Sequence, residues 1–512
     1  MGGSKFTSPS SAFSLRKLNG GLNSSFSPVN IQDNEASDLL NIDFDKFGSF
    51  IKRNGYDTLN TSAFNSGAKW TGLHWFEMSD GSKFLTGTCG SKLAKMDDLD
   101  GTWDDITGAL TVNTTALNTF RTYRDMTIGT NGTNAVFKWV GSGNGAVLGG
   151  LAGGGSAPTI NWSKWVEIFS NYTILANFSE SSTPHRSRFM WSAIGTTETW
   201  DVADFIDVNR DDGQEITGIQ VLGNRLIIFK RYSIFAAVFT GDADIPFIVE
   251  QTQSHVGCES GYSIQPTDNG LIFLSQDGYY FFDGNNSTKL SDRINNTIDT
   301  FNRNLFSNSV SIYQKQKNRY WSAQTLSGGS SNSRAITFDT FNNAFSLYKG
   351  HNIASMCLVY VSGQERVYFG DYSGYVYRAD IGTEDNPLNV ETTFSSYLYT
   401  KWFDYGDLAS SKATTQIFVY YQIASAIITL TYAYDLNLGD QYQLNLDTST
   451  SADMYDTAIY DTATYASQGG DFQRKDLTGR GRVIRFGFKN GTLDETMQVD
   501  GFGLWAHQET IN

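Results

Sequence analysis

The chain has 512 residues and a formal net charge of −15, with 40% hydrophobic and 14% aromatic residues. Because this length exceeds the size at which a single hydrophobic core usually stops growing, we expect at least two domains. The acidic charge argues against a protein that wraps nucleic acid by neutralising phosphates, but it is compatible with an acidic wall past which DNA slides.

The residue composition indicates an all-β protein. The sequence contains 35 Phe, 26 Tyr and 11 Trp, and large aromatic rings suit pleated, half-buried surfaces. It also contains 50 Gly but only 7 Pro, which indicates many tight turns. Many short strands joined by hairpins form a sandwich, a barrel or a propeller rather than a helical fold.

The cysteines and the N-terminal residues bear on the compartment. Cys89, Cys258 and Cys357 are far apart and have no Cys-x-x-Cys spacing, so we expect buried small hydrophobic residues in a reducing compartment. Residues 1–14 are rich in Ser and lack the apolar region of a signal peptide, and no run reaches the roughly 18 apolar residues of a membrane span. We therefore expect a soluble protein made in a cytoplasm.

The N-terminal region divides into two segments. Residues 1–12 are small and polar, which predicts a flexible arm. In residues 13–64, turn signals alternate with single apolar residues, which is typical of an extended strap that lies across another surface. An ordinary hairpin at a sheet edge explains this pattern equally well.

Residues 65–382 show a loose repeat in which two β-rich runs flank a Gly or Asp-Gly turn. The clearest units are Gly270–Gly284 and Arg366–Arg378. Similar hairpins are predicted at Lys83–Lys95, Met126–Val140, Asn224–Val238 and Arg319–Tyr348. Their spacing is roughly the 40 to 50 residues of one propeller blade. The pattern favours a β-propeller of about six or seven blades over the alternative, a pair of packed β-sandwiches.

Two low-complexity segments interrupt the repeat and the region after it. Gly141–Ser156 is rich in glycine and is predicted to be an inter-blade loop or an exposed linker. From residue 383 the β-runs become longer, so residues 383–512 are predicted to form an additional β-sandwich-like domain. Within it, Met454–Tyr465 repeats Tyr-Asp-Thr-Ala in five-residue steps that suit neither helix nor strand, and a long irregular loop is expected there.

The sequence contains no recognisable catalytic or metal-binding motif. Its five His residues, at positions 74, 185, 255, 351 and 507, are never three or four residues apart, and no Gly-x-Ser-x-Gly motif occurs. We therefore predict a non-enzymatic protein with no catalytic, cofactor-binding or metal-binding residues. A propeller hydrolase is the alternative, because its paired carboxylates would be distant in sequence.

The most concentrated positive charge lies near the C-terminus, at Arg474, Lys475, Arg480, Arg482, Arg485 and Lys489. In a continuous β-run over 479–488, Arg480 and Arg482 would share one face while Arg485 would lie on the other. We predict either a contact with an acidic neighbouring subunit or a surface that faces DNA phosphates. The alternative is a solvated strand edge that carries charge to prevent pairing.

Several short motifs together resemble one group of proteins. Gly20-Gly-Leu-Asn23, the acidic segment Glu35–Asp45 and Lys52-Arg-Asn-Gly-Tyr56 are similar to the N-terminal strap of structural proteins from tailed bacteriophages. In that group the third motif is usually Arg-Pro-Gly-Tyr, and here Asn54 stands in place of the Pro.

Further motifs extend this resemblance over most of the chain. Phe189–Trp200 with Ala203–Ile206 is similar to a recurrent blade motif of the same group, and Asp277–Gly284 and the Tyr-Asp-Thr-Ala repeat also match. The chain thus resembles the tail nozzle or tail hub proteins, of the tail tubular or DNA-stabilisation type, of short-tailed bacteriophages.

The resemblance implies a virion structural protein of the phage tail that is synthesised in the host bacterial cytoplasm. About six copies would form a ring through which double-stranded DNA passes during ejection, and the head-tail adaptor and other tail proteins would dock on it. One alternative is a tail-tip protein that binds a host glycan, for example through Gly141–Ser156. A propeller glycosidase is the other.

Overall fold

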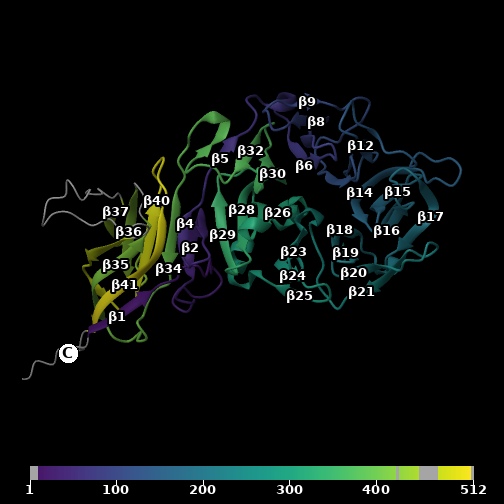
Figure 1. Cartoon of the computed structure of the whole chain (residues 1–512). Helices are drawn as coiled ribbons and strands as arrows, with labels where there is room; N and C mark the ends of the chain where they lie inside the picture. The colour runs from purple at the N-terminus through teal and green to yellow at the C-terminus, as the bar shows by residue number, and fades with distance from the viewer. Residues whose placement is uncertain (1–9, 423–425, 449–470, 509–512) are drawn as a thin grey trace, which may run out of the picture.

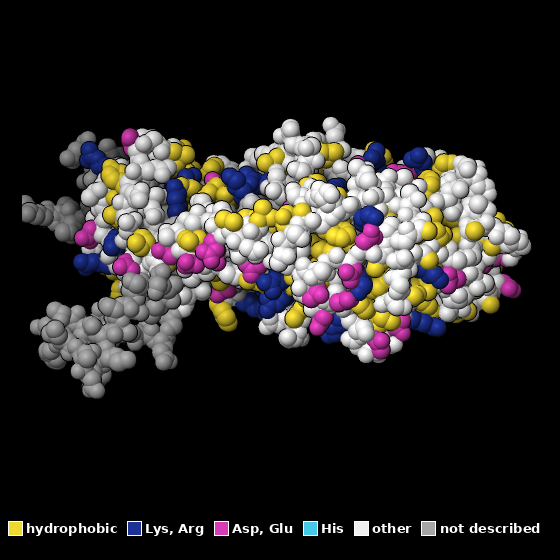
Figure 2. Space-filling model, turned by 90° about the horizontal axis from the view of Figure 1, so that it is seen from above, with side chains coloured by type: hydrophobic (Ala, Val, Ile, Leu, Met, Phe, Trp, Pro, Cys, Tyr) yellow, Lys and Arg dark blue, Asp and Glu magenta, His cyan; other side chains and the backbone are white. Residues whose placement is uncertain are grey.

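The structure is a computed structural model that describes residues 10–422, 426–448 and 471–508. It has two parts, a ring of small sheets and a pair of larger sheets beside it (Figure 1). Viewed from above, the molecule is elongated, and acidic and basic side chains are interspersed over the face that this view shows (Figure 2). Residues 1–9 of the predicted flexible arm and the Tyr-Asp-Thr-Ala repeat at 454–465 lie outside the described residues.

Within the described residues, the ring consists of seven sheets, which we number as blades 1 to 7 in chain order. Their strands pair antiparallel except in blade 7, where β33 pairs with β5 in parallel. Blade 1 comprises β6 (Trp70–Glu77), β7 (Lys83–Cys89), β8 (Lys92–Asp97) and β9 (Asp104–Asp105). Blade 2 comprises β10 (Thr119–Tyr123), β11 (Met126–Thr130), β12 (Phe137–Trp139) and β13 (Ala146–Val147). Blade 3 comprises β14 (Ile160–Phe169), β15 (Tyr172–Glu180), β16 (Thr183–Ser192) and β17 (Trp200–Asp207). Blade 4 comprises β18 (Ile216–Leu222), β19 (Arg225–Lys230), β20 (Ile234–Phe239) and β21 (Phe247–Gln251).

The remaining blades complete the ring. Blade 5 comprises β22 (Gln265–Pro266), β23 (Leu271–Ser275), β24 (Gly278–Phe282) and β25 (Ser287–Lys289). Blade 6 comprises β26 (Ser311–Gln314), β27 (Arg319–Thr325), β28 (Asn332–Asp339) and β29 (Ala344–Lys349). Blade 7 comprises β30 (Ser355–Val361), β31 (Gln364–Gly370), β32 (Val376–Ala379), β5 (Tyr56–Thr58) and β33 (Asp385–Asn386). Because β5 comes from the N-terminal region and pairs with β32, the last blade joins the two ends of the ring.

The blades form where the sequence places apolar runs around tight turns. In blade 5, Ser275 pairs with Gly278 across a two-residue turn, and every residue of β23 is buried because blades pack on both of its faces. The six predicted hairpins all lie within blades. The glycine-rich segment predicted as an inter-blade loop contains β13, the outermost strand of blade 2, before it continues to blade 3.

The described helical segments are all short. The α-helix α1 spans Asn295–Ile298, and the 3-10 helices are η1 (Phe64–Gly67), η2 (Arg210–Asp212), η3 (Gly261–Ser263), η4 (Ser291–Ile294), η5 (Arg303–Asn308), η6 (Lys315–Lys317) and η7 (Pro387–Asn389). Among the residues described, no helix is long and apolar enough to span a membrane.

The second part is a β-sandwich that draws strands from both ends of the chain. Its seven-stranded sheet contains β1 (Ser10–Leu15), β3 (Ile42–Phe44), β4 (Phe50–Lys52), β35 (Lys412–Tyr421), β38 (Asp471–Asp476), β39 (Arg480–Gly481) and β41 (Gln498–Gln508). Its five-stranded sheet contains β2 (Ala36–Leu40), β34 (Ser396–Thr400), β36 (Ile427–Tyr434), β37 (Tyr442–Asp447) and β40 (Ile484–Asn490). The Phe502 ring from the first sheet lies 5.4 Å from the Phe486 ring of the second.

The predicted fold class, an all-β propeller with an additional β-sandwich-like domain, is confirmed. The hydrophobic core of the sandwich continues into blades 5 and 6, because Phe502 belongs to the same buried cluster as Tyr279 and Ile336. The predicted domain boundaries at residues 12, 64 and 382 stay predictions. Strand pairing adds that the segment predicted as a strap supplies β2, β3 and β4 to the sandwich and β5 to blade 7.

A single buried arginine, Arg53, lies where the sandwich and two blades meet. Its side chain is 1% exposed and forms a bidentate ion pair with Asp385 of blade 7, at 2.8 and 2.7 Å. It also donates to the carbonyl oxygen of Lys349, at the end of blade 6, and to the side-chain oxygen of Asn41, between β2 and β3.

Every donor of this guanidinium has an acceptor. The fifth N–H group donates to the carbonyl oxygen of Asn54, and the ring of Phe394 lies 3.7 Å from the guanidinium carbon. Because a guanidinium has five N–H donors in a rigid plane, their full satisfaction fixes the positions of all the groups around it. Arg53 therefore holds the sandwich against the propeller.

We predict that Arg53→Met lowers the free energy of unfolding by about 3–5 kcal/mol, because it leaves the Asp385 carboxylate buried without a partner. Chemical denaturation monitored by tryptophan fluorescence measures this change. The matched control is Arg303→Met, which removes an exposed ion pair with Asp299 and should cost less than about 1 kcal/mol. Equal effects of the two substitutions would contradict this role for Arg53.

Candidate functional site

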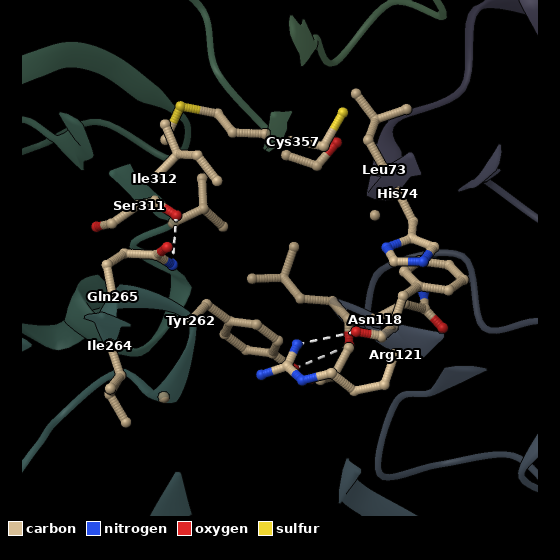
Figure 3. Close-up of a pocket in the computed structure, with 18 of the residues that line it drawn as sticks. Leu73, His74, Asn118, Arg121, Tyr262, Ile264, Gln265, Ser311, Ile312 and Cys357 are labelled. Carbon is tan, nitrogen blue, oxygen red and sulfur yellow. Dashed lines mark hydrogen bonds between the residues drawn. The ribbon is translucent and has the colours of Figure 1, made fainter. Parts of the chain in front are cut away.

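The innermost strands of the seven blades surround a central channel. The channel encloses a cavity of about 370 Å³, lined by residues of β6, β10, β14, β18, β22, β26 and β30 and of the loops beside them. Figure 3 shows side chains from opposite sides of the ring pointing into this space. The cavity is therefore the natural place to look for a ligand or catalytic site.

A tyrosine from blade 5 reaches across the channel. Tyr262, labelled in Figure 3, lies on η3, just before blade 5. Its hydroxyl donates to the carbonyl oxygen of Leu117, which precedes blade 2, at 2.9 Å. Its ring packs against that of Trp165 at 4.9 Å. Gly261 permits this approach, because a side chain there would meet the carbonyl oxygen of Thr217 at 2.3 Å. Since blades 3 and 4 separate blade 2 from blade 5, this hydrogen bond bridges non-adjacent blades.

The charged groups beside the channel are paired across neighbouring blades. Arg121 of β10 forms a bidentate ion pair with Glu167 of β14, at 2.7 and 2.8 Å, and donates to Gln220 of β18 at 3.1 Å. His74 of β6 is hydrogen-bonded to the Thr122 hydroxyl at 2.8 Å. These contacts join blades 1 to 4.

The channel has little capacity for acid–base chemistry. Among the described residues that line it, the ionisable side chains are His74, Arg121, Tyr262 and Cys357, with no carboxylate. Burial lowers the pKa of His74 to about 3, an effect that nearby Arg121 reinforces. Burial also raises the pKa of Tyr262 and that of Cys357. At neutral pH this leaves an uncharged imidazole, a protonated phenol and a protonated thiol. In the part of the chain that is described, no cluster of three or more His, Cys, Asp or Glu residues could hold a metal ion.

The six basic residues predicted as a cluster are divided between two sheets. Arg474 and Lys475 lie on β38 and Arg480 on β39, both in the seven-stranded sheet, whereas Arg485 and Lys489 lie on β40 in the five-stranded sheet. Arg482 lies between β39 and β40.

The expectation of one continuous β-run over 479–488 is wrong, because the chain crosses from one sheet to the other at 482–483. Gly481 permits the crossing, since a side chain there would meet Tyr434 and Asp435 at 2.8 to 3.0 Å. Arg480, Arg482 and Arg485 therefore do not lie on the two faces of a single strand, as was predicted.

Two of these basic residues pack on an aromatic ring. The Arg485 guanidinium carbon lies 4.2 Å, and the Lys489 amine 5.1 Å, from the ring centre of Tyr399. Tyr399 pairs with Gly487, so its ring covers the glycine between the two cations. Such cation–π contacts stabilise a half-buried charge at a sheet surface. A role for the six residues in contacting a subunit or facing DNA stays a prediction.

No protein-family model matches the sequence, and the search of curated proteins finds no match. Among solved structures, the chain is similar to BamB from Moraxella catarrhalis, with 11% identity, a TM-score of 0.35 and coverage of 67% of this chain and 96% of that one. It is also similar to the WD40 domain of Neurospora crassa Pan2, with 8% identity, a TM-score of 0.38 and coverage of 66% of this chain and 97% of that one. A third similar structure is YCF48 bound to D1 peptide, with 10% identity, a TM-score of 0.39 and coverage of 64% of this chain and 95% of that one. At these low scores we base the description of the propeller on the strand pairing of this chain.

We predict that acid destabilises the wild-type protein more steeply than the variant His74→Gln. A His in the unfolded chain has a pKa of about 6.5, so it binds a proton below that pH. His74 in the folded protein binds a proton only near pH 3, because burial lowers its pKa to about 3. The stability due to neutral His74 is complete above about pH 6.5 and is lost as the pH falls, by at most about 1.4 kcal/mol per pH unit.

Chemical denaturation at intervals between pH 7 and pH 4.5 measures this slope for both proteins. The other His residues and the carboxylates are common to both, so the difference in slope isolates residue 74. Parallel pH profiles would contradict a neutral, buried His74.

Proposed function

We propose that the protein is a virion structural component that forms the ring-shaped nozzle or hub of a short-tailed bacteriophage tail. In this proposal the ring is a conduit for DNA ejection and a platform on which other tail proteins dock, and the chain has no enzymatic activity. The resemblance of the strap motifs supports it, and one of those motifs, Lys52–Tyr56, contains the arginine that joins the two parts of the molecule. A propeller with a split sandwich is compatible with this role.

The conduit in this proposal lies between copies of the chain and not along the propeller axis. The channel of each propeller holds only about 370 Å³ and is crossed by the hydrogen bond from Tyr262 to Leu117. Duplex DNA, whose major groove alone is about 12 Å wide, does not fit there. The net charge of −15 suits a conduit wall, because like charge keeps the duplex from adhering during passage.

The observation that carries the proposal of assembly is a pair of exposed phenylalanines on adjacent turns. Phe47 lies in the turn between β3 and β4 of the sandwich and is 86% exposed. Phe341 lies in the turn between β28 and β29 of blade 6 and is 60% exposed. We call the turns 45–49 and 339–342, with these two rings, the paired-turn surface.

Hydrogen bonds fix the conformation of both turns. The Asp45 side chain accepts the backbone N–H groups of Phe47, Gly48 and Ser49, at 2.9, 2.8 and 2.7 Å. The Asp339 side chain likewise accepts the N–H groups of Phe341 and Asn342, at 2.8 and 3.0 Å.

A hydrogen bond also connects the two turns. The side-chain amide of Asn342 donates to the carbonyl oxygen of Asp45 at 3.0 Å. The paired-turn surface borders a cavity of about 380 Å³ between blades 5 and 6, lined by Phe341 and by apolar residues that include Ile272, Phe281 and Phe338. Rigid exposed aromatic residues beside an apolar hollow lose little conformational entropy on binding, so they suit the centre of an interface. We infer that this surface contacts a neighbouring copy of the chain.

We predict that the purified protein forms a closed oligomer of about six chains and that Phe47→Ser with Phe341→Ser reduces its mass. Both rings are exposed in the single chain, so the thermal midpoint of a monomer should change little while the contact between copies weakens. Multi-angle light scattering at several concentrations measures the mass.

Ile245→Ser is the matched control, because Ile245 is 61% exposed in the loop between β20 and β21 of blade 4 and is not part of the paired-turn surface. A wild-type monomer at all concentrations would count against the ring. An oligomer of unchanged mass in the double variant would count against the paired-turn surface as the contact.

A further inference from the structure

A second cavity, of about 600 Å³, lies where blades 3 and 4 meet. Three chain segments form it: the start of β16 at 183–187, the connection between β17 and β18 at 207–215, and the turn between β19 and β20 at 231–232. It shares no lining residue with the central channel or with the cavity beside the paired-turn surface. Its chemistry is also different, because three arginines, Arg186, Arg210 and Arg231, line it.

Most of the charged groups around this cavity have a partner of opposite charge, and Glu180 lies 3.9 Å from Arg188 and 3.7 Å from His185. Asp207 is paired with Arg188 at 2.7 Å, Arg231 with Glu259 at 2.8 Å, and Glu215 contacts both Arg186, at 3.5 Å, and Lys164, at 3.8 Å. Arg210, by contrast, has no carboxylate within 4.0 Å among the residues that the structure describes.

The wall of the cavity is thus a local positive site in a chain of net charge −15. The three arginines outnumber the two carboxylates that line the cavity, Asp207 and Glu215, and such an excess of positive charge attracts anionic ligands.

The segment that carries Arg210 is held in place from beneath. The Lys230 side chain is fully buried, and its amine is paired with Asp212 at 2.8 Å and donates to the carbonyl oxygen of Asn209 at 3.1 Å. The Ser187 hydroxyl donates to the carbonyl oxygen of Gln214. A buried, paired lysine under a surface loop fixes that loop, so the cavity exists before any ligand binds.

An aromatic ring stands at the rim of the cavity. Tyr232 is 53% exposed, and its backbone N–H donates to the side chain of Gln214 at 2.9 Å. Its hydroxyl accepts a hydrogen bond from the Gln276 side chain at 3.2 Å. A ring held in this way offers a flat apolar face to a ligand, and the C–H face of a sugar ring packs on such a surface.

From this combination we propose that the cavity binds a sugar that carries a carboxylate, that is, a uronic acid residue of an acidic polysaccharide. Guanidinium groups bind carboxylates in a bidentate geometry, which assigns Arg210 to the acid group. Asp207 and Glu215 accept hydrogen bonds from sugar hydroxyls. The same two carboxylates oppose a doubly charged phosphate, so a phosphorylated sugar fits less well. The volume suits a short oligosaccharide.

The test is isothermal titration of the full-length protein with trigalacturonate, with maltotriose as the neutral trisaccharide and with glucose 6-phosphate as the phosphorylated sugar. We expect trigalacturonate to bind and maltotriose and glucose 6-phosphate to bind at least about tenfold more weakly, because each charge-assisted hydrogen bond contributes about a factor of ten or more. Arg210→Gln should weaken trigalacturonate binding to the same extent, and Tyr232→Ala should weaken it too.

The control variant is Arg366→Gln, a half-buried arginine of β31 in blade 7 that does not line the cavity and should leave binding unchanged. The thermal midpoint of each variant shows whether it folds. Absence of trigalacturonate binding at millimolar concentration, tighter binding of glucose 6-phosphate, or equal binding by Arg210→Gln and wild type would each overturn the proposal. None of these outcomes depends on whether the chain forms a ring, so this site and the proposed conduit are tested separately.

Discussion

The arrangement of the whole molecule depends on the buried ion pair between Arg53 and Asp385. Arg53 follows β4 of the sandwich and precedes β5 of blade 7, so the chain passes from one part to the other within a few residues. The pair joins positions 332 residues apart. Asp385 would be a buried charge without a partner if the segment that carries Arg53 were out of position. The propeller and the sandwich therefore each depend on the other for a stable structure. Contacts of such long sequence separation form late, after much of the chain is ordered.

The N-terminal segment that carries Arg53 also covers an edge of the propeller, the outer edge of blade 6. The outermost strand of blade 6, β29, would present unpaired backbone groups to solvent. Instead, the N–H groups of Leu22 and Asn41 donate to the carbonyl oxygens of Phe345 and Leu347, at 2.8 and 2.7 Å. The segment covers this edge of the propeller and carries strands into the sandwich, so the edge is not available for uncontrolled association. The paired-turn surface, through which we propose that copies associate, lies beside this covered edge.

The local features of the propeller could be predicted from the sequence because they depend on residues close together. Runs such as Gly270–Gly284 combine apolar strands with a tight turn, and such hairpins form within the blades. The hairpin that β15 and β16 form in blade 3 is not among those predicted. Its second strand, β16, begins with the polar residues Thr183–Ser187, and the apolar pattern starts only after them. Closure of the ring by β5 has no local signal, since three residues pair with a strand more than 300 positions away.

The candidate sites were less predictable for the same reason. The basic cluster is close together in sequence, yet the chain crosses between two sheets within it, so proximity along the chain did not give one continuous strand. Arg121 of blade 2 and Tyr262, which precedes blade 5, both line the channel, and Glu167 of blade 3 pairs with Arg121 beside it. Nothing in their separate sequence surroundings indicates these contacts. The arginines of the cavity between blades 3 and 4 likewise come from three separate segments: Arg186 from β16, Arg210 from η2 and Arg231 from the turn between β19 and β20. The channel and this cavity can be described only once the ring of blades is known, because their residues are distant in sequence.

The central claim is that DNA passes through a ring of chains while each propeller channel stays closed. Electron cryomicroscopy of the assembled protein tests this most directly. We expect a closed ring with one central pore wide enough for duplex DNA, and propellers whose own channels are occupied by Tyr262. Single separate molecules, or an assembly with no central pore, would contradict it.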